Sequence, residues 1–316
     1  MRVLVTGGAG FIGSHLCEEL LDAGHDVRAV DAFTDYYDPA AKRANVAELR
    51  SRPGFELVEV NLVTANVELL LDGIEVVFHL AGQPGVRNSW ASGFPDYVQA
   101  NVVATQRLLE AARTEKGLRR FVNASSSSIY GEDPTYPTVE TQLPRPHSPY
   151  GVTKLAAEHL CGAYAANWGV PTVTLRYFTV YGPRQRPDMA IHRFVLAAMR
   201  GEEVALFGDG EQRRDFTYVT DVVSATISAA VRDVEPGTVV NVAGGSDCTV
   251  NELIEIIAAE VGTPFAVRRE AAQAGDVRRT MADTTRAREL LAWAPALSLA
   301  EGVAHQVHWH LARQRS

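Results

Sequence analysis

The chain has 316 residues, 46% of them hydrophobic and 22% charged, which is enough for one large domain or two closely joined ones with a substantial core. Its 38 acidic and 30 basic side chains give a net charge of −8, which argues against nucleic acid as a partner because nucleic-acid-binding proteins usually present a basic face. Uncharged apolar runs of about 18 residues are absent, so no membrane span is expected, and three widely spaced cysteines favour a reducing, cytoplasmic compartment.

Short apolar segments alternate with helix-length amphipathic segments in the first half of the chain. The expected strands are Val3–Thr6, Asp26–Val30, Glu56–Val60, Val76–His79, Phe121–Ala124 and Thr172–Arg176, and the expected helices are Ile12–Ala23, Tyr97–Thr114 and Tyr150–Asn167. Because the chain starts directly in a strand, no cleavable signal is expected. Strands that are apolar throughout and separated by helices are typical of a parallel sheet covered on both faces. The sequence therefore predicts an α/β fold with a doubly wound parallel sheet of the Rossmann type.

The regular alternation ends after Tyr181, where glycine and two prolines predict an irregular segment at Gly182–Pro187. The later elements are expected at Ile191–Arg200, Val204–Phe207, Asp221–Val231, Thr238–Val242, Val250–Val261 and Ala300–Leu311. The helix and strand within 221–242 resemble elements that rejoin the sheet, so the second domain is predicted to be discontinuous. We expect a dinucleotide-binding domain of residues 1–180 plus about 218–245, and a smaller α/β substrate domain of 181–217 plus 246–316.

A glycine-rich turn follows the first strand and opens the first helix. Gly7, Gly10 and Gly13 permit a tight turn and a close approach of a pyrophosphate to the helix N-terminus. An ordinary strand-to-helix turn is the alternative for a glycine pattern alone. Asp31, at the end of the second strand, is placed to accept hydrogen bonds from an adenosine ribose. The two residues after it carry no cation for a 2′-phosphate, which favours NAD over NADP.

Tyr150 and Lys154 are four residues apart and therefore share one face of the predicted helix. A nearby ammonium favours the phenolate of a tyrosine, which then becomes a general base for an alcohol that loses hydride. A solvated Tyr–Lys pair on a helix surface is the alternative. The hydroxyl run Ser125–Ser128 favours the catalytic interpretation, since it lies at the carboxyl end of a predicted strand, where ligands bind in such sheets. The alternative for the serines is a polar loop.

These motifs together resemble the extended short-chain dehydrogenase/reductase superfamily, and in particular its nucleotide-sugar epimerases, over essentially the whole chain. The further motifs that carry the resemblance are His79–Gly82, Arg176–Phe178, Gly182–Arg184 and Arg214–Val219. The resemblance implies that Ser126 is the catalytic hydroxyl, Tyr150 the base, and Lys154 its activator and a ligand of the nicotinamide ribose. The cofactor contacts implied for NAD are Gly7, Gly10, Phe11, Ile12, Gly13, Asp31, Asn61, Leu62, Leu80, Ala81, Gly82, Tyr150, Lys154 and Tyr177. Asn61 departs from the family, in which aspartate is usual near the adenine.

Within this group the chain is more similar to UDP-glucuronate 4-epimerases than to UDP-galactose 4-epimerases. The similarity lies in the long segment Asp31–Pro39, in the segment Gln83–Arg87, and in Thr179, where galactose epimerases typically have asparagine. A hydroxyl cluster of Ser127, Ser128 and Thr179 is expected to hold a sugar carboxylate. The substrate contacts implied for a UDP-sugar are Gln83, Arg87, Ser127, Ser128, Thr179, Arg186, Arg193, Arg214 and Gln273. Arg87 and Arg186 are the nearest candidates for charge compensation, and Arg214 for the diphosphate.

The expected reaction is 4-epimerisation of UDP-glucuronate to UDP-galacturonate by transient oxidation at C4, with tightly held NAD. One alternative is a UDP-glucose/UDP-galactose 4-epimerase, and another is a non-catalytic member that only binds NAD and a nucleotide sugar. The resemblance also implies a homodimer built on the helices Tyr97–Thr114 and Tyr150–Asn167. The spacing of His305, His308 and His310 does not place them on one helical face, so a solvated helix and no metal site are expected.

Overall fold

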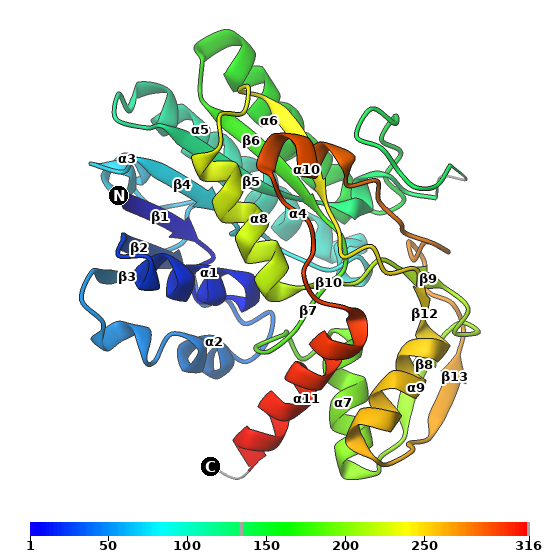
Figure 1. Cartoon of the computed structure of the whole chain (residues 1–316). Coiled ribbons are helices and arrows are strands. Elements are labelled where there is room, and N and C mark those ends of the chain that lie inside the picture. Colours follow the sequence, from blue (N-terminus) through cyan, green and yellow to red (C-terminus); the bar gives the residue numbers. More distant parts are fainter. Residues whose placement is uncertain (133–134, 315–316) are drawn as a thin grey trace.

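The structure is a computed structural model that describes residues 1–132 and 135–314 (Figure 1). Its centre is a seven-stranded sheet with the order β11-β6-β5-β4-β1-β2-β3, in which all neighbouring strands are parallel. The strands are β1 (Arg2–Thr6), β2 (Asp26–Asp31), β3 (Phe55–Glu59), β4 (Val76–His79), β5 (Arg120–Ser126), β6 (Thr172–Tyr177) and β11 (Thr238–Val242). The doubly wound α/β prediction is confirmed. The strand order reverses at β1, which pairs with β2 on one side and β4 on the other.

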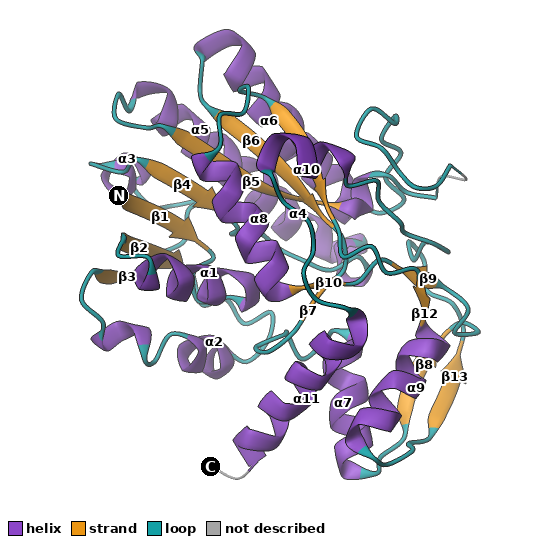
Figure 2. Ribbon diagram, viewed as in Figure 1, coloured by secondary structure: helices purple, strands orange, loops and turns teal. Residues whose placement is uncertain are grey.

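Helices cover both faces of the sheet (Figure 2). On one face α1 (Phe11–Asp22) packs against α8 (Val219–Val231), and on the other α5 (Ala104–Thr114) packs against α3 (Val67–Leu71) and α6 (Pro149–Trp168). Successive strand residues point to opposite faces. Val3 and Val5 of β1 therefore belong to the core below α1 and α8, while Leu4 between them belongs to the core below α3, α5 and α6.

A smaller region lies beyond the carboxyl edge of the sheet. Its strands pair as β7 (Val180–Tyr181) with β10 (Thr217–Tyr218), β8 (Val204–Phe207) with β13 (Val267–Glu270), and β9 (Arg213–Arg214) with β12 (Cys248–Thr249). Its helices are α7 (Ala190–Arg200), α9 (Val250–Val261) and α11 (Leu299–Gln314), and α9 packs against both others (Figure 1). A further helix, α10 (Thr285–Leu291), packs against α8 and β11.

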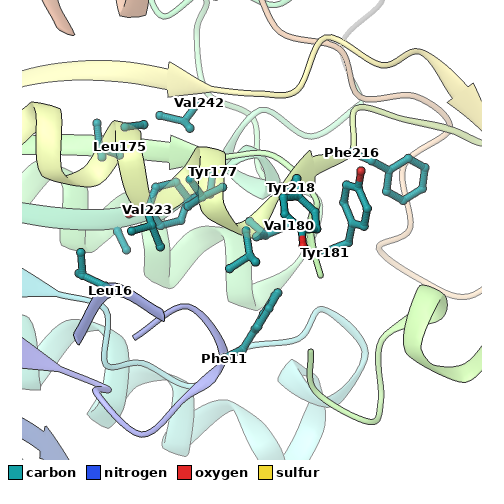
Figure 3. Close-up of a cluster of buried hydrophobic side chains, with 14 of the residues drawn as sticks. Phe11, Leu16, Leu175, Tyr177, Val180, Tyr181, Phe216, Tyr218, Val223 and Val242 are labelled. Atoms are coloured by element: carbon teal, nitrogen blue, oxygen red, sulfur yellow. The ribbon is translucent and has the colours of Figure 1, made fainter. Parts of the chain in front are cut away.

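Aromatic side chains join this region to the sheet. The ring of Tyr181 lies edge-on to Phe216 and Tyr218, with ring centroids 6.2 and 5.5 Å apart. Figure 3 shows these rings beside Phe11 of the glycine-rich turn and Tyr177 of β6, all within one buried cluster. The hydrophobic core therefore continues from the cofactor side of the sheet into the smaller region.

The predicted helix Tyr97–Thr114 is helical throughout, but part of it is a π-helix. A short helix α4 (Phe94–Tyr97) is followed by a π-helical turn at Val98–Val103 before α5 begins. Inside this turn the buried Asn101 accepts a hydrogen bond from the Gln83 amide at 2.7 Å and donates to Thr153 Oγ1 at 3.0 Å. Single-turn π-bulges of this kind are frequent at functional sites. Hydrophobic periodicity predicted the helix but could not show the π-helical turn within it.

Several short elements were not predicted, and one helix face was predicted wrongly. Helices α2 (Pro39–Asn45), α3 and α10 are too short to establish a helical period. The terminal helix was expected to be solvated, yet His310 is buried, with its ring centroid 4.8 Å from that of His192 in α7. Among the described residues, none of the helices combines the length and apolar character that a membrane crossing requires.

Candidate active site

A cavity of about 580 Å³ opens at the carboxyl ends of the central strands. Every residue that the family resemblance implied for NAD lines it, from Gly7 in the glycine-rich turn to Tyr177 at the end of β6. Ligands of open parallel sheets bind at this edge, where the strand order reverses. The cavity therefore lies where the topology predicts a binding site.

The glycine-rich turn brings the backbone of β1 close to the start of α1. Gly7 has a φ of +70°, which side chains other than glycine rarely adopt, and a Cβ on Gly13 would lie 2.1 Å from the Gly7 carbonyl oxygen. Helix α1 begins after Gly10 without a side-chain cap. Its first backbone amides are therefore open to an anionic ligand, for which the positive end of the helix dipole is also favourable. This cradle fits the pyrophosphate of a dinucleotide.

We expect Gly13→Ala to remove the bound cofactor. The added methyl group must displace the Gly7 carbonyl or α1, because backbone cannot rotate away as a flexible side chain can, and overpacking of this kind costs about 1–3 kcal/mol or more. The NAD content of the purified protein and its Tm measure the effect. Gly162→Ala is the matched control, since a Cβ there meets open space. Full NAD content in Gly13→Ala would contradict the close-approach argument.

Asp31 has a cationic partner that the sequence did not reveal. The buried carboxylate accepts hydrogen bonds from the Ala9 and Phe33 amides at 3.3 and 2.9 Å, and Lys42 of α2 lies 3.0 Å from its Oδ1. Lys42 also lines the cavity. The two residues after Asp31 carry no cation, and Lys42 supplies one from farther along the chain. The segment between Asp31 and Lys42 folds back toward Asp31, and this contact in space could not be inferred from the separation of the two residues in the sequence.

The departure from the family pattern at Asn61 has a simple local explanation. Its side-chain oxygen accepts a hydrogen bond from the Val63 amide at 2.9 Å. An aspartate oxygen could accept the same bond, so the turn survives the substitution. Asn61 and Leu62 both line the cavity.

The catalytic candidates come from β5 and α6. Helix α6 starts at Pro149, and the side chain of Ser148 caps it by accepting a hydrogen bond from the Gly151 amide at 3.1 Å. This start places Tyr150 and Lys154 on the side of the helix that faces the cavity, which both residues line. The Lys154 ammonium donates to the Ala124 carbonyl at 2.8 Å. Ser126, at the end of β5, is hydrogen-bonded to Tyr150.

Burial and neighbouring groups act on Tyr150 in opposite directions. Burial raises the pKa of its phenol, whereas the hydrogen bond to Ser126 and the positive charge of Arg186 lower the pKa. Burial also lowers the pKa of Lys154 to about 8. The net effect raises the pKa of Tyr150 above its ordinary value, so action as a general base near neutral pH requires further positive charge close to the phenol.

The candidate substrate residues divide into two groups. Gln83 and Arg186 line the cavity, and the Arg186 guanidinium binds Asp188 through two hydrogen bonds of 3.0 and 2.9 Å. Arg87 is exposed and lies outside the cavity lining, where its guanidinium pairs with Asp276 at 2.9 Å and stacks 4.1 Å from the Phe207 ring centroid.

Arg214 lies near Arg87, and the carboxylate of Asp276 acts on both. Burial lowers the pKa of Arg214, and Asp276 opposes this effect while Arg87 adds to it. Glu132 acts on Arg214 in the same direction as Asp276, so both guanidinium groups lie among carboxylates, with Arg87 paired directly to Asp276. Arginines suit a diphosphate ligand because their planar forks match phosphate geometry.

The remaining candidates do not line the cavity. Ser127 and Ser128 form a 3-10 turn after β5, in which the Ser128 amide donates to Ser126 Oγ at 3.1 Å. The Thr179 carbonyl accepts from the Thr217 amide at 2.8 Å, which holds Thr179 between β6 and β7. Arg193 donates to the Ala205 carbonyl at 3.4 Å and Gln273 to the Ala271 carbonyl at 3.2 Å, so the structure shows local partners for both.

Some cavity residues were missed by the sequence analysis. Tyr36, in the long segment after β2, lines the cavity and is hydrogen-bonded to Tyr97 and Asn88. Ser125, which belongs to the predicted hydroxyl run but had been assigned no contact of its own, lines the cavity, and its hydroxyl donates to the buried Glu158 at 3.2 Å. The tyrosines of the Asp31–Pro39 segment were noted as a resemblance, but nothing in their spacing showed that they return to the cavity.

Comparisons with known proteins agree with this geometry. Residues 3–243 match the model of the NAD dependent epimerase/dehydratase family. The chain is 43% identical to an uncharacterized UDP-glucose epimerase, YtcB of Bacillus subtilis, over 97% of each chain. It is 36% identical to a UDP-glucuronate 4-epimerase of Thermodesulfobacterium geofontis, over 97% of this chain and 95% of the other.

A solved structure shares the whole fold. The UDP-glucuronic acid 4-epimerase of Bacillus cereus, crystallised with UDP-glucuronic acid and NAD, superposes with a TM-score of 0.96 and 39% identity over 100% of both chains. With the glycine cradle, Asp31 and the Tyr150–Lys154 pair at the carboxyl edge of the sheet, the chain belongs to the NAD dependent epimerase/dehydratase family.

Proposed function

We propose that the protein is an NAD-dependent 4-epimerase of a UDP-sugar, and that it interconverts UDP-glucuronate and UDP-galacturonate. The observation that carries the proposal is the Ser126–Tyr150–Lys154 group beside a cavity lined by all the residues expected to hold NAD. Dehydratases and decarboxylases that resemble this chain place acidic side chains where Ser127 and Ser128 stand here. Without such a carboxyl, abstraction of a proton at C5 lacks its usual base, whereas epimerisation at C4 needs only oxidation, rotation and reduction.

In the proposed reaction Tyr150 holds and moves one proton. Its phenolate oxygen takes the proton of the C4 hydroxyl, and Ser126 orients that hydroxyl through its hydrogen bond to Tyr150. When bound, NAD accepts the C4 hydride and returns it, so it is regenerated in each turnover. The 4-keto sugar turns about its diphosphate link between the two steps, and Tyr150 then returns the proton. Arg87 and Arg214 are proposed to hold the diphosphate.

Support for a uronate substrate comes from hydroxyl side chains near the end of β5 and β6. Ser127 and Ser128 follow β5, and Thr179 follows β6, the neighbouring strand in the sheet. Carboxyl ends of paired parallel strands meet at one edge, so the three hydroxyls are proposed to bind the carboxylate together. Arg186, which lines the cavity, is proposed to compensate its charge, with Gln83 beside it. The Bacillus cereus and Thermodesulfobacterium relatives bear names that agree with this substrate.

A UDP-glucose/UDP-galactose 4-epimerase is the second candidate, since the Bacillus subtilis relative carries a UDP-glucose epimerase name. The purified enzyme should be incubated separately with UDP-glucuronate and UDP-glucose, and the epimers separated by chromatography. The proposal expects kcat/KM to be higher for UDP-glucuronate. Preferred turnover of UDP-glucose would overturn it, and bound NAD without turnover of either sugar would indicate a non-catalytic binding protein.

Thr179→Ala is expected to increase decarboxylation of the intermediate. The 4-keto form of a glucuronate is a β-keto acid, which loses CO2 when its carboxylate bond aligns with the carbonyl π system. We propose that the Thr179 hydroxyl helps to hold the carboxylate out of this alignment. The share of 4-keto-pentose among the products, measured by mass spectrometry, should therefore rise severalfold. Thr220→Ala, an exposed threonine on α8, is the control. An unchanged product ratio in Thr179→Ala would refute this role.

We also propose a cytoplasmic homodimer formed through α5 and α6. The proposal follows the family resemblance, and the apolar residues Val152 and Trp168 on α6, which are 48% and 59% exposed, would be available to a partner. Light scattering during size-exclusion chromatography should give twice the mass of one chain. A monomer at micromolar concentration would contradict this assembly. The division into a cofactor domain of 1–180 plus about 218–245 and a substrate domain of 181–217 plus 246–316 remains part of the proposal.

A further inference from the structure

Two buried glutamines connect the C-terminal helix to the segment that carries Arg186. Gln306 of α11 and Gln185 of the irregular segment have exposed fractions of 0% and 4%. The Gln306 amide nitrogen donates to Gln185 Oε1 at 2.9 Å, and Gln306 Oε1 accepts from the Gly182 amide at 3.0 Å. The amide nitrogen and the amide oxygen of Gln306 therefore both bind residues of the segment Gly182–Pro187. A buried amide has a net cost unless it is hydrogen-bonded, so the pairing fixes the segment in one position.

Gln185 extends this network into the neighbouring elements. Its amide nitrogen donates to the Val180 carbonyl at 3.1 Å, and its Oε1 also accepts from the His192 amide at 3.0 Å. Gln185 therefore ties the end of β7 to the start of α7, the two elements between which Arg186 lies. The network is specific for amides, because each bond needs a donor or an acceptor at a defined end of the side chain.

The same segment is also fastened to α1. Burial lowers the pKa of His15 to about 4, and the neutral ring donates to the Pro183 carbonyl at 2.9 Å. Arg184 pairs with Glu18 at 2.7 Å and has a φ of +62°, in the left-handed region that a side chain disfavours. Backbone in such a conformation persists only where the surroundings determine it strongly, and this is frequent at functional sites.

The segment presents Arg186 to the cavity. Arg186 and Tyr150 line the same cavity, and the Arg186 guanidinium lies 5.8 Å from the ring centroid of Tyr36. The Arg186 guanidinium is also paired with the carboxylate of Asp188. Burial has the largest influence on the pKa of Tyr150, followed by Ser126, Arg186 and Tyr36, and a second cation, Lys154, lines the same cavity.

We propose that Gln306 is a positioning residue of the active site, and that it acts through Gln185 and Gly182 to hold the Arg186 guanidinium beside Tyr150. The inference rests on the proposed function in taking this cavity as the site of reaction. Gln306 itself does not line the cavity. Its contribution is geometric, because a shift of the segment would carry Arg186 away from the phenol.

Two variants of Gln306 and one neighbour test the proposal. Gln306→Leu fills a similar volume without either hydrogen bond, and Gln306→Glu keeps an acceptor for the Gly182 amide but, when ionised, cannot donate to Gln185. Both are expected to lower kcat/KM about tenfold near neutral pH, the size that follows from losing a buried hydrogen bond. Val307→Ala is the matched control, since Val307 is the next residue of α11 and is buried in the hydrophobic core. It should lower the Tm and leave kcat/KM unchanged.

The pH profile and a double-mutant cycle separate positioning from general destabilisation. Loss of the nearby positive charge raises the pKa of Tyr150, so the acid limb of the rate profile should move to higher pH in Gln306→Leu but not in Val307→Ala. In an Arg186→Ala background, the further effect of Gln306→Leu should disappear, because the route through Arg186 is already removed. Additive effects of the two substitutions, or a Gln306→Leu profile equal to that of Val307→Ala, would overturn the inference.

A measurement without turnover keeps the inference separate from the proposed function. The ionisation of Tyr150 can be followed by NMR in the NAD-bound protein with labelled tyrosine, and Tyr150→Phe assigns the signal. A higher pKa in Gln306→Leu than in the wild type supports the positioning role even if neither UDP-sugar is converted. An unchanged pKa refutes it, whichever substrate the enzyme turns over.

Discussion

Tyr150→Phe is expected to lower kcat by about 10²–10⁴-fold, the range typical for loss of a general base. The substitution removes only the hydroxyl that is hydrogen-bonded to Ser126 and leaves the ring in place. The ring of Tyr97, edge-on to that of Tyr150 with centroids 6.1 Å apart, keeps its contact. The fold and the glycine cradle should therefore be unaffected, and the loss should fall on the chemical step rather than on binding.

The measurement is the initial rate of epimer formation together with the NAD content of the purified protein. Tyr164→Phe is the matched control, because Tyr164 lies on the same helix but its hydroxyl bonds to Glu110 and Gln106. Tyr164→Phe should retain activity. If Tyr150→Phe kept more than about a tenth of the wild-type kcat, a different group would have to serve as the base, and the proposed mechanism would fail.

Lys154→Met should be the second most damaging single substitution, with kcat lowered about 10²-fold near neutral pH. The Lys154 ammonium is fixed by its hydrogen bond to the Ala124 carbonyl at 2.8 Å and lines the cavity with Tyr150. Its positive charge favours the phenolate, and methionine fills a similar space without charge. We also expect weaker NAD retention, since the resemblance implies a contact of Lys154 with the nicotinamide ribose.

The pKa of Lys154 predicts the shape of the alkaline limb. Burial lowers that pKa to about 8. The ammonium is therefore present below pH 8 and is lost as the pH rises through this value, so wild-type activity should fall on the alkaline side. This limb should be absent in Lys154→Met. Lys154→Arg keeps its charge throughout and should move the limb beyond the measured range. An identical alkaline limb in all three proteins would show that another group titrates there.

Local sequence patterns were sufficient for the fold and for the cofactor side of the site. The strands of the central sheet begin and end within two residues of their predicted bounds. Short apolar runs that alternate with helices are typical of buried parallel strands, so these segments were recognisable in the sequence. Apart from Tyr150 and Lys154 on α6, the cofactor residues lie at the ends of β1, β2, β3, β4 and β6 or shortly after them, and the parallel topology brings these strand ends to one edge. Lys154 was found because its spacing from Tyr150 matches a helical turn.

Contacts between distant segments were not predictable in this way. Lys42 approaches Asp31 only because α2 folds back over β2. Asn101, in the π-helical turn of the predicted helix, bonds to Gln83 and Thr153, which are far from it in the chain. Ser127, Ser128, Thr179, Arg193 and Gln273 were grouped with the substrate by resemblance, and the structure places none of them in the cavity lining.

The amino-acid sequence by itself determined the doubly wound sheet, the glycine cradle and the pairing of Tyr150 with Lys154, since each can be recognised from local patterns of residues. The tertiary structure decided which charges meet in the site. Arg186 reaches the cavity because Gln306, more than a hundred residues later in the chain, holds its segment through Gln185. Charges act over distance in space, and only packing of the complete chain sets those distances.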